Sequence, residues 1–265
     1  MSEINIDSTV IFLDVRNFTP LMRNFSQDVR FINLIRNVYE NGINYASCFC
    51  KDDEFYLNST GDGFLCIFMG EYHYIKAYLF GILLIKKLEP MFKEYFADKD
   101  DKYKPRNGMY YYGIGIESGL VSKVNTDLSQ TKYVETYLGN VINLAARIES
   151  LSKEHGRAPM LYGPDINERL TKIVTEGESY KDFMKKAKDN KSSFAVGTSH
   201  QTMNKVNEEL LSSYLFEHNL KGIVDDAIPI FRISPTLLNN LNLQTWTFLS
   251  QIPEDIRCKF IELYS

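Results

Sequence analysis

The sequence predicts an α/β protein with an antiparallel-rich sheet and helices packed on it. Short runs rich in β-branched and aromatic residues alternate with longer segments that carry apolar residues at helical spacing. The expected order is strand, helix, strand, strand, helix, strand, which is the order of a ferredoxin-like sandwich. The 265 residues are 44% hydrophobic and include 17 Phe and 17 Tyr, enough for one large core. We therefore expect one domain, with an appendage at most.

The first strand and helix are predicted close to the N-terminus. Residues 8–15 (STVIFLDV) form a short apolar run that ends on an acid, Asp14, as a buried strand does when it delivers a side chain to the rim of a sheet. Residues 26–47 carry apolar side chains at helical spacing. Ser26 is the candidate N-cap of this helix.

A hairpin and a second helix follow. The runs FYLNST and GFLCIF both read as strands, and they are joined through Gly61 and Asp62 as in a tight turn. Asp62 is therefore expected on the turn. Residues 71–96 carry an apolar face at helical spacing and predict a helix.

The second half of the chain predicts further strands around one more helix. Residues 109–118 (MYYYGIGIES) resume strand, and a helix is expected to begin near Gly139. Residues 224–234 read as a late strand. These elements complete the sandwich.

Two segments fall outside this pattern. Residues 165–213 are lysine-rich and weakly patterned, and we expect a helical insertion or lid there. Residues 235–265 predict a C-terminal helical appendage, expected to pack on its own domain. The catalytic or binding domain is thus assigned to residues 1–234, with 165–213 inserted in it.

Composition excludes several classes of partner. The net charge of -4 provides no overall basic field, so a nucleic-acid or anionic-membrane partner is not expected. The longest apolar run, residues 77–85, is about half the length of a membrane span and predicts a buried helix instead. No basic stretch followed by an apolar run opens the sequence, so no secretory signal is expected. The four cysteines lack the spacing of a disulfide scaffold or zinc site and are interpreted as reduced thiols, which predicts a cytoplasmic protein.

Two acids are candidates for metal binding. If the first strand lies beside the hairpin, Asp14 and Asp62 converge, and hard oxygen ligands of this kind suit Mg²⁺ or Mn²⁺. The turn RNFTP follows Asp14 and supplies backbone N–H groups at the start of a helical segment, which suits phosphate oxygens. The alternative is that either acid is merely solvated. Metal and phosphate together suggest a nucleotide.

Five motifs then resemble one family. FLDVRNFTPLM and STGDGFLCIF resemble the two metal motifs of the class III nucleotidyl cyclases, and YLGNVINLAARIE resembles the helix that carries their transition-state residues. GIGIESGLV and NLKGI also match, and all five occur in the family's order across residues 10–233. The resemblance implies the fold of the class III cyclase catalytic domain.

The resemblance implies roles for two residues of the helix. Asn143 would hold the ribose, and Arg147 would meet the negative charge that develops on the α-phosphate. Their spacing of four places both on one face, while Val141, Leu144 and Ile148 anchor the other. The alternative is an ordinary surface amide and arginine.

It also implies how metals and phosphates bind. Two divalent ions, Mn²⁺ or Mg²⁺, would be held by Asp14, Asp62 and the backbone carbonyl of Val15. Backbone groups of Phe18 and Thr19 would contact the triphosphate. Family members place the metal acids and the Asn/Arg helix on opposite protomers, which implies a head-to-tail homodimer with shared active sites.

Two further features concern the two ends of the substrate. Lys221, in the motif NLKGI, would contact the terminal phosphate. Family members that use ATP carry a lysine and an aspartate, and those that use GTP a glutamate and typically a cysteine, at the positions of Asn58 and Thr136. Both purine codes are therefore missing, which argues for a changed substrate. Tyr56 could add stacking surface for a one-ring base, and Leu138 is placed beside Thr136 in the same pocket.

This pattern resembles the pyrimidine cyclases of bacterial anti-phage (Pycsar) systems. Their members convert UTP or CTP to a cyclic mononucleotide that a separate effector senses, and UTP is favoured here over CTP. The alternatives are an adenylyl or guanylyl cyclase with unusual base readers, and, in another class, a catalytically silent module that binds a nucleotide and only regulates. Substrate competition would distinguish an adenylyl or guanylyl cyclase from a pyrimidine cyclase. Retention of Asp14, Asp62, Asn143, Arg147 and Lys221 argues against the second.

Overall fold

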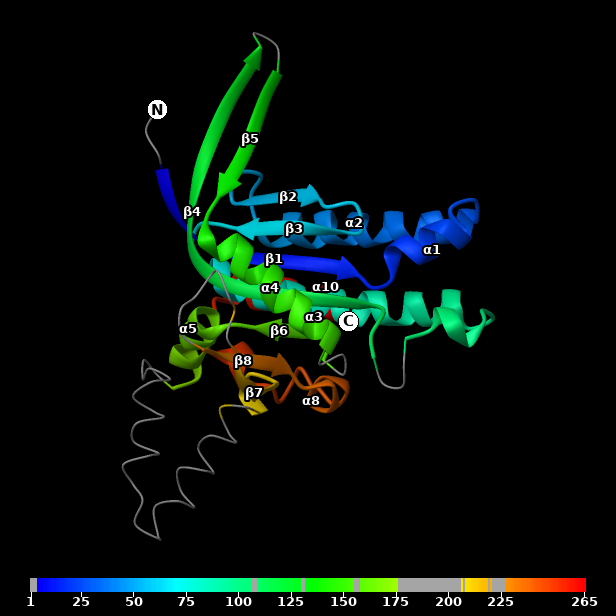
Figure 1. Cartoon of the computed structure of the whole chain (residues 1–265). Coiled ribbons are helices and arrows are strands. Elements are labelled where there is room, and N and C mark those ends of the chain that lie inside the picture. Colours follow the sequence, from blue (N-terminus) through cyan, green and yellow to red (C-terminus); the bar gives the residue numbers. More distant parts are fainter. Residues whose placement is uncertain are drawn as a thin grey trace.

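The computed structural model describes residues 4–105, 109–129, 132–154, 158–175, 206, 208–218, 220 and 227–265. Its centre is an eight-stranded sheet in the order β2-β3-β1-β4-β6-β8-β7, with β5 paired to β4 (Figure 1). The pair β4 and β6 is parallel, and the other described pairs are antiparallel. The strands are β1 Ile4–Val15, β2 Phe55–Ser59, β3 Gly63–Phe68, β4 Tyr112–Ser129, β5 Lys132–Leu138, β6 Met160–Tyr162, β7 Ser212–His218 and β8 Ile228–Ile233. The predicted antiparallel-rich α/β fold is confirmed.

Helices cover both faces of the sheet. In Figure 1, α2 and α3 lie behind it and α4 crosses in front. The helices are α1 Phe18–Phe25, α2 Val29–Phe49, α3 His73–Phe96, α4 Asn140–Glu154, α5 Pro164–Val174, α8 Pro235–Asn239, α9 Thr247–Ser250 and α10 Glu254–Tyr264, with a 3₁₀ turn at Asp101–Tyr103. The apolar face of each long helix packs on the sheet, as the helical spacing predicted.

Helix α3 is the centre of the larger core. The apolar run at residues 77–85 lies within it and is buried along its length. The prediction of a buried helix is therefore confirmed. Within the described residues, no helix has the length and apolar character needed to cross a membrane.

Two local predictions were wrong. Helix α2 begins at Val29, and its N-cap is Asp28, whose side chain accepts a hydrogen bond from the Arg30 N–H at 2.9 Å, not Ser26. Ser26 instead follows the separate short helix α1. The strand expected at 109–118 extends to Ser129 and turns back as β5, a hairpin that projects beyond the sheet (Figure 1). The projecting part is rich in polar residues, so it lacks the apolar pattern by which strands are predicted.

Both ends of the segment 165–213 belong to elements of the domain, and the insertion between them stays a prediction. The first residues of the segment belong to α5, whose Ile166 and Leu170 are fully buried in the domain core. Its last two residues begin strand β7. Residues 176–205 lie outside the described residues.

The C-terminal residues form three short helices that pack on the rest of the chain. Helix α10 lies against α2 and α3. Five large apolar side chains of this C-terminal segment are buried in the same core as α3: Trp246, Phe248, Leu249, Ile252 and Phe260. Packing within the chain is thus confirmed, whereas the domain boundary at 235 stays a prediction.

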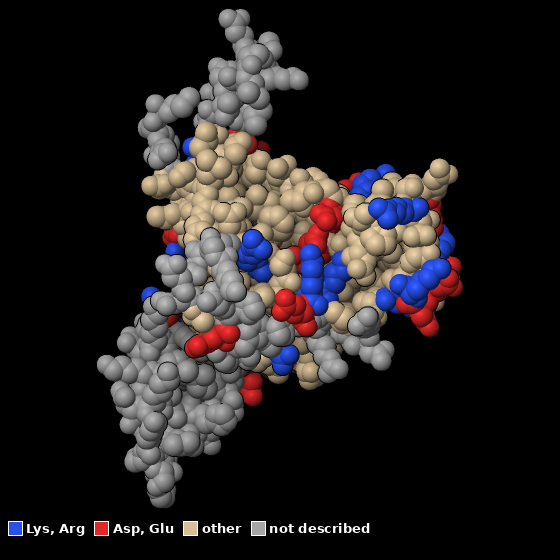
Figure 2. Space-filling view, in the orientation of Figure 1, with Lys and Arg blue, Asp and Glu red and all other residues tan. Residues whose placement is uncertain are grey.

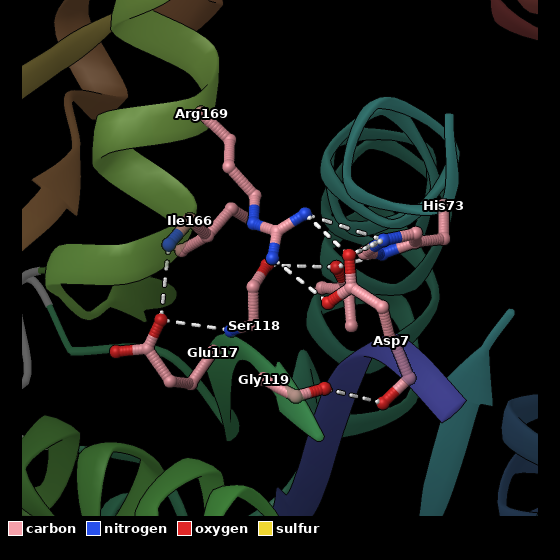
Figure 3. A network of polar contacts seen from close by, with 9 residues as sticks. Asp7, His73, Glu117, Ser118, Gly119, Ile166 and Arg169 are labelled. Atoms are coloured by element: carbon pink, nitrogen blue, oxygen red, sulfur yellow. Dashed lines mark hydrogen bonds and ion pairs between the residues drawn. The ribbon is translucent and has the colours of Figure 1, made fainter. Parts of the chain in front are cut away.

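Near the start of β1, a polar network joins β1, α3 and α5 (Figure 3). Arg169 of α5 donates two hydrogen bonds to the Asp7 carboxylate, at 2.8 and 2.9 Å. His73 lies 3.3 Å from the same carboxylate through Nε2, and its Nδ1 is 2.7 Å from the Thr9 hydroxyl. Burial lowers the pKa of His73, an effect opposed by Asp7 and reinforced by Arg169. The network orients α5 on the sheet.

Candidate active site

Asp14 and Asp62 are brought together by the pairing of β1 with β3. Asp14 lies opposite Gly63 in the antiparallel register, and the Val15 N–H donates to the Asp62 carbonyl at 2.9 Å. A Cβ atom at Gly63 would overlap the carbonyl oxygen of Leu13, so the close approach requires glycine. Both carboxylates line one pocket of about 940 Å³.

The pocket also contains the start of helix α1. Asn17, its N-cap, has a φ of 56°, and no side chain caps the helix. Phe18 and Thr19 at the first turn line the pocket. Because the first N–H groups of a helix lack partners within the helix and carry partial positive charge, this end of α1 suits an anion.

The charges around Asp14 oppose one another. Its side chain is 13% exposed, and burial raises its pKa, an effect opposed by Lys153 and reinforced by Asp62. The Lys153 Nζ lies 2.8 Å from Asp14 Oδ2. A carboxylate that is buried beside a second carboxylate favours a nearby cation.

The donor set fits a divalent metal. Two carboxylates and the Val15 carbonyl offer hard oxygen atoms, which Mg²⁺ and Mn²⁺ prefer. No group of three or more His, Cys, Asp or Glu side chains with metal-binding geometry occurs among the described residues. A pair of carboxylates is the usual protein contribution to Mg²⁺ that binds together with substrate phosphates.

Several charged residues at the site were missed by the sequence analysis. Arg16 is 9% exposed, and its Nη2 donates to the carbonyl oxygen and to the hydroxyl of Ser152 on α4, at 2.7 and 3.0 Å. Its Nε and Nη1 have no hydrogen-bond partner among the described residues. Burial raises the pKa of Glu149 to about 7, with Lys153 opposing and Asp14 reinforcing the shift. The signal available in the sequence was the spacing of Glu149 and Lys153, which puts both on one face of the helix.

Helix α4 presents Asn143 and Arg147 on an exposed face. Val141 and Ile148 are buried on the opposite side, and Leu144 is partly buried there, as expected. Neither Asn143 nor Arg147 lines the pocket of Asp14 and Asp62. Figure 2 shows acidic and basic side chains side by side on this face, where β1 ends and α4 crosses.

Comparison with solved structures identifies the architecture. A bacterial light-regulated adenylyl cyclase matches with a TM-score of 0.55 and 16% identity, over 98% of this chain and 59% of that one. The adenylyl cyclase CyaB from P. aeruginosa matches with a TM-score of 0.56 and 16% identity, over 88% of this chain and 96% of that one. The guanylyl cyclase Cya2 matches with a TM-score of 0.50 and 15% identity, over 88% and 94%.

This is the fold of the class III nucleotidyl cyclase catalytic domain. No family model and no curated protein matches the sequence. The chain spans 59% of the length of the light-regulated cyclase, and about all of the CyaB structure. In this fold, Asp14 lies at the end of β1 and Asp62 in the turn before β3.

The predicted base-reading residues lie on two strands of the cyclase fold. On β2, Tyr56 is half-buried, its ring centroid is 4.9 Å from that of Tyr137, and its hydroxyl lies 3.4 Å from the Glu135 carbonyl. Asn58 is exposed two residues further along the same strand. The remaining two, Thr136 and Leu138 on β5, alternate with Glu135 and Tyr137 and so point to the other side of the strand.

The structure therefore brings Tyr56 to β5 but does not gather the four predicted base readers into one cluster. Leu138 is 57% exposed. Lys221, expected at the terminal phosphate, lies outside the described residues.

Proposed function

We propose that this chain is a pyrimidine nucleotide cyclase that converts UTP to 3',5'-cyclic UMP and diphosphate. The observation that carries the proposal is the pairing of Asp14 with Asp62 beside the uncapped start of α1, within a cyclase fold. A domain that dimerises for purely structural reasons would not need two adjoining carboxylates. The arrangement suits a nucleoside triphosphate with its divalent cations.

The reaction requires mainly that the protein position the substrate and stabilise the charge that develops on its phosphates. The ribose 3'-hydroxyl attacks the α-phosphorus in line and expels diphosphate. Mg²⁺ or Mn²⁺, when bound by Asp14, Asp62 and the Val15 carbonyl, supplies Lewis-acid chemistry that activates the hydroxyl and neutralises the leaving group. The N–H groups of Phe18 and Thr19 hold phosphate oxygens.

The residues of helix α4 act from the partner protomer in this proposal. Asn143 holds the ribose and Arg147 stabilises charge on the α-phosphate. Their exposure, and their absence from the pocket of their own chain, support a head-to-tail homodimer with two shared sites. Lys221 completes the contacts to the triphosphate.

Pyrimidine specificity rests on the residues at the base. Asn58 and Thr136 replace the side chains that read a purine, and the amide and hydroxyl can each donate and accept, which suits the edge of uracil or cytosine. Tyr56 and Leu138 would supply apolar surface for the base. UTP is preferred over CTP by analogy with the anti-phage pyrimidine cyclases, and the product would act as a second messenger for a separate effector in the cytoplasm.

The test is to incubate the purified protein with Mn²⁺ and each of ATP, GTP, CTP and UTP separately, and to identify products by chromatography and mass. Cyclic UMP as the main product is expected. Cyclic CMP would correct the base but keep the pyrimidine assignment. Cyclic AMP or GMP would show that the missing purine code was misinterpreted. If no product forms, calorimetric titration with each nucleotide in Ca²⁺ separates a silent nucleotide-binding module from a chain that binds none.

A further inference from the structure

The ammonium group of Lys153 lies against Asp14, where the candidate site would bind a metal ion. Its Nζ lies 2.8 Å from Asp14 Oδ2 and 3.7 Å from Glu149 Oε2. It lines the same pocket as Asp62. Its ammonium group is thus paired with Asp14, one of the two carboxylates that would hold a divalent ion.

The ion pair between Lys153 and Asp14 is open enough to solvent for the ammonium group to leave Asp14. Lys153 stands in the last turn of α4, and its side chain is 49% exposed. Arg16, the other cation beside Asp14, is 9% exposed and bound to Ser152. The lysine has a flexible stem and one contact under 3 Å, so its ammonium can turn toward the pocket while the arginine stays fixed.

The other lysines of the pocket do not share this contact. Lys102 pairs with Asp100 at 3.3 Å, and Lys104 pairs with Asp101 at 3.1 Å. Both line the pocket. Lys153 alone among the described lysines forms an ion pair with Asp14.

We propose that Lys153 is a resident cation that competes with the divalent metal for Asp14 and, once displaced, binds the triphosphate in the same pocket. This inference rests on the proposed function, because it assumes the metal site at Asp14 and Asp62. When metal enters alone, the ion pair is lost without replacement. When metal enters with a triphosphate, the released ammonium gains a phosphate partner.

Metal and triphosphate are therefore coupled through Lys153. Each increases the affinity of the protein for the other, and the coupling is reciprocal. Removal of the lysine should strengthen the binding of metal alone and weaken the binding of the metal-triphosphate complex. If Lys153 has no role in binding, its removal should change neither affinity.

The first measurement is a titration of Mn²⁺ into metal-free protein without nucleotide, followed by the electron paramagnetic resonance signal of free Mn²⁺. Lys153→Met is expected to bind Mn²⁺ roughly three- to tenfold more tightly than wild type, the range expected for loss of a partly exposed ion pair. Lys102→Met removes the same charge from the same pocket and controls for the general field. It is expected to change the affinity by less than about twofold.

The second measurement is calorimetric titration with manganese-loaded inorganic triphosphate, which carries no base. Lys153→Met is expected to bind it about tenfold more weakly than wild type. Lys153→Arg keeps a cation and should stay near wild type in both titrations. Lys153→Gln, which also removes the charge, replaces the methionine variant if that variant does not fold.

The outcomes separate the two proposals. Asp62→Ala should abolish specific Mn²⁺ binding. If it does so while Lys153→Met leaves both affinities unchanged, the inference about Lys153 is overturned and the metal site stands. If Asp62→Ala binds Mn²⁺ as wild type does, the metal site and the inference both fail.

Discussion

Arg16 donates from one nitrogen, Nη2, to both the carbonyl oxygen and the hydroxyl of Ser152. This bond ties the end of β1, which carries Asp14, to the last turns of α4, which carries Asn143 and Arg147. A positive charge there also stabilises the C-terminal end of the helix dipole. In a dimer with shared sites, one rigid unit of each chain would thus serve both sites.

Loss of this bond should destabilise the protein. Arg16→Met is expected to lower the free energy of unfolding by about 2 to 3 kcal/mol, because a buried charge-assisted bond is lost and the Ser152 carbonyl loses a partner. Urea unfolding followed by circular dichroism measures it. Arg23→Met, an exposed arginine on α1, is the control and should change stability by less than about 0.5 kcal/mol. Equal midpoints for Arg16→Met and wild type would show that the bond contributes little.

Shared active sites predict complementation between two inactive variants. Asp62→Ala and Arg147→Ala should each form a folded dimer with almost no product, because one lacks a metal ligand and the other the charge at the α-phosphate; we expect a loss of roughly a hundredfold or more. A mixed dimer keeps one intact site. After co-refolding of equal amounts, random pairing makes about half of the dimers mixed, so cyclase activity should return to about a quarter of wild type.

Cyclase assays before and after mixing measure this recovery. The matched control is the double variant Asp62→Ala/Arg147→Ala mixed with wild type. With shared sites only the wild-type homodimers are active and activity should be about a quarter of wild type, whereas it would be about half if each chain formed its own site. If the two single variants mixed together remain inactive, sites shared in this way are excluded.

Glu117 should make stability depend on pH. It is fully buried and accepts hydrogen bonds from the Ser118 and Ile166 N–H groups, and burial raises its pKa from 4.5 to about 8. Between these values the folded protein holds a proton that the unfolded chain has lost. Stability contributed by the proton is therefore present at low pH and is lost as the pH rises toward 8, with a slope of up to about 1.4 kcal/mol per pH unit.

Glu117→Gln removes this titration. Urea unfolding at pH 5.5 and 7.5 should show a loss of stability with rising pH that is about 2 kcal/mol smaller in the variant than in wild type. Glu94→Gln, on the exposed side of α3, should follow wild type. Parallel pH profiles for wild type and Glu117→Gln would mean that Glu117 is ionised in the folded protein across this range.

The C-terminal helices should contribute directly to stability. Phe260 is fully buried on α10 and contacts Trp246 and Tyr264, with ring centroids at 5.9 and 5.3 Å. Phe260→Ala is expected to cost about 3 to 5 kcal/mol. Its neighbour Ile261 is 36% exposed, and Ile261→Ala should cost much less. A single unfolding transition shifted by Phe260→Ala would show that the tail folds with the domain, and an unchanged transition would show that it is an independent appendage.

Local pattern accounts for most of what could be predicted. The apolar runs of β1 and β3 and the helical spacing of α2, α3 and α4 are properties of neighbouring residues, because burial of one face repeats with a period of 2 or 3.6. The projecting β4–β5 hairpin lacks such a face, so the predicted strand ended at residue 118 although β4 continues to Ser129. The start of α2 was misplaced because Ser26 and Asp28 are both good caps, and only the observed turn selects Asp28.

The sequence by itself determined the fold class, the two acids and the face of α4 that carries Asn143 and Arg147. Only the tertiary structure decided that Lys153 and Arg16 meet Asp14, that Tyr56 reaches β5, and that Asn143 and Arg147 stay out of the pocket of their own chain. The reason is the range of the interactions. Periodic burial is encoded within one element, whereas contacts between ionisable groups depend on strand register and on how α4 crosses the sheet, which residues far apart in the chain fix together.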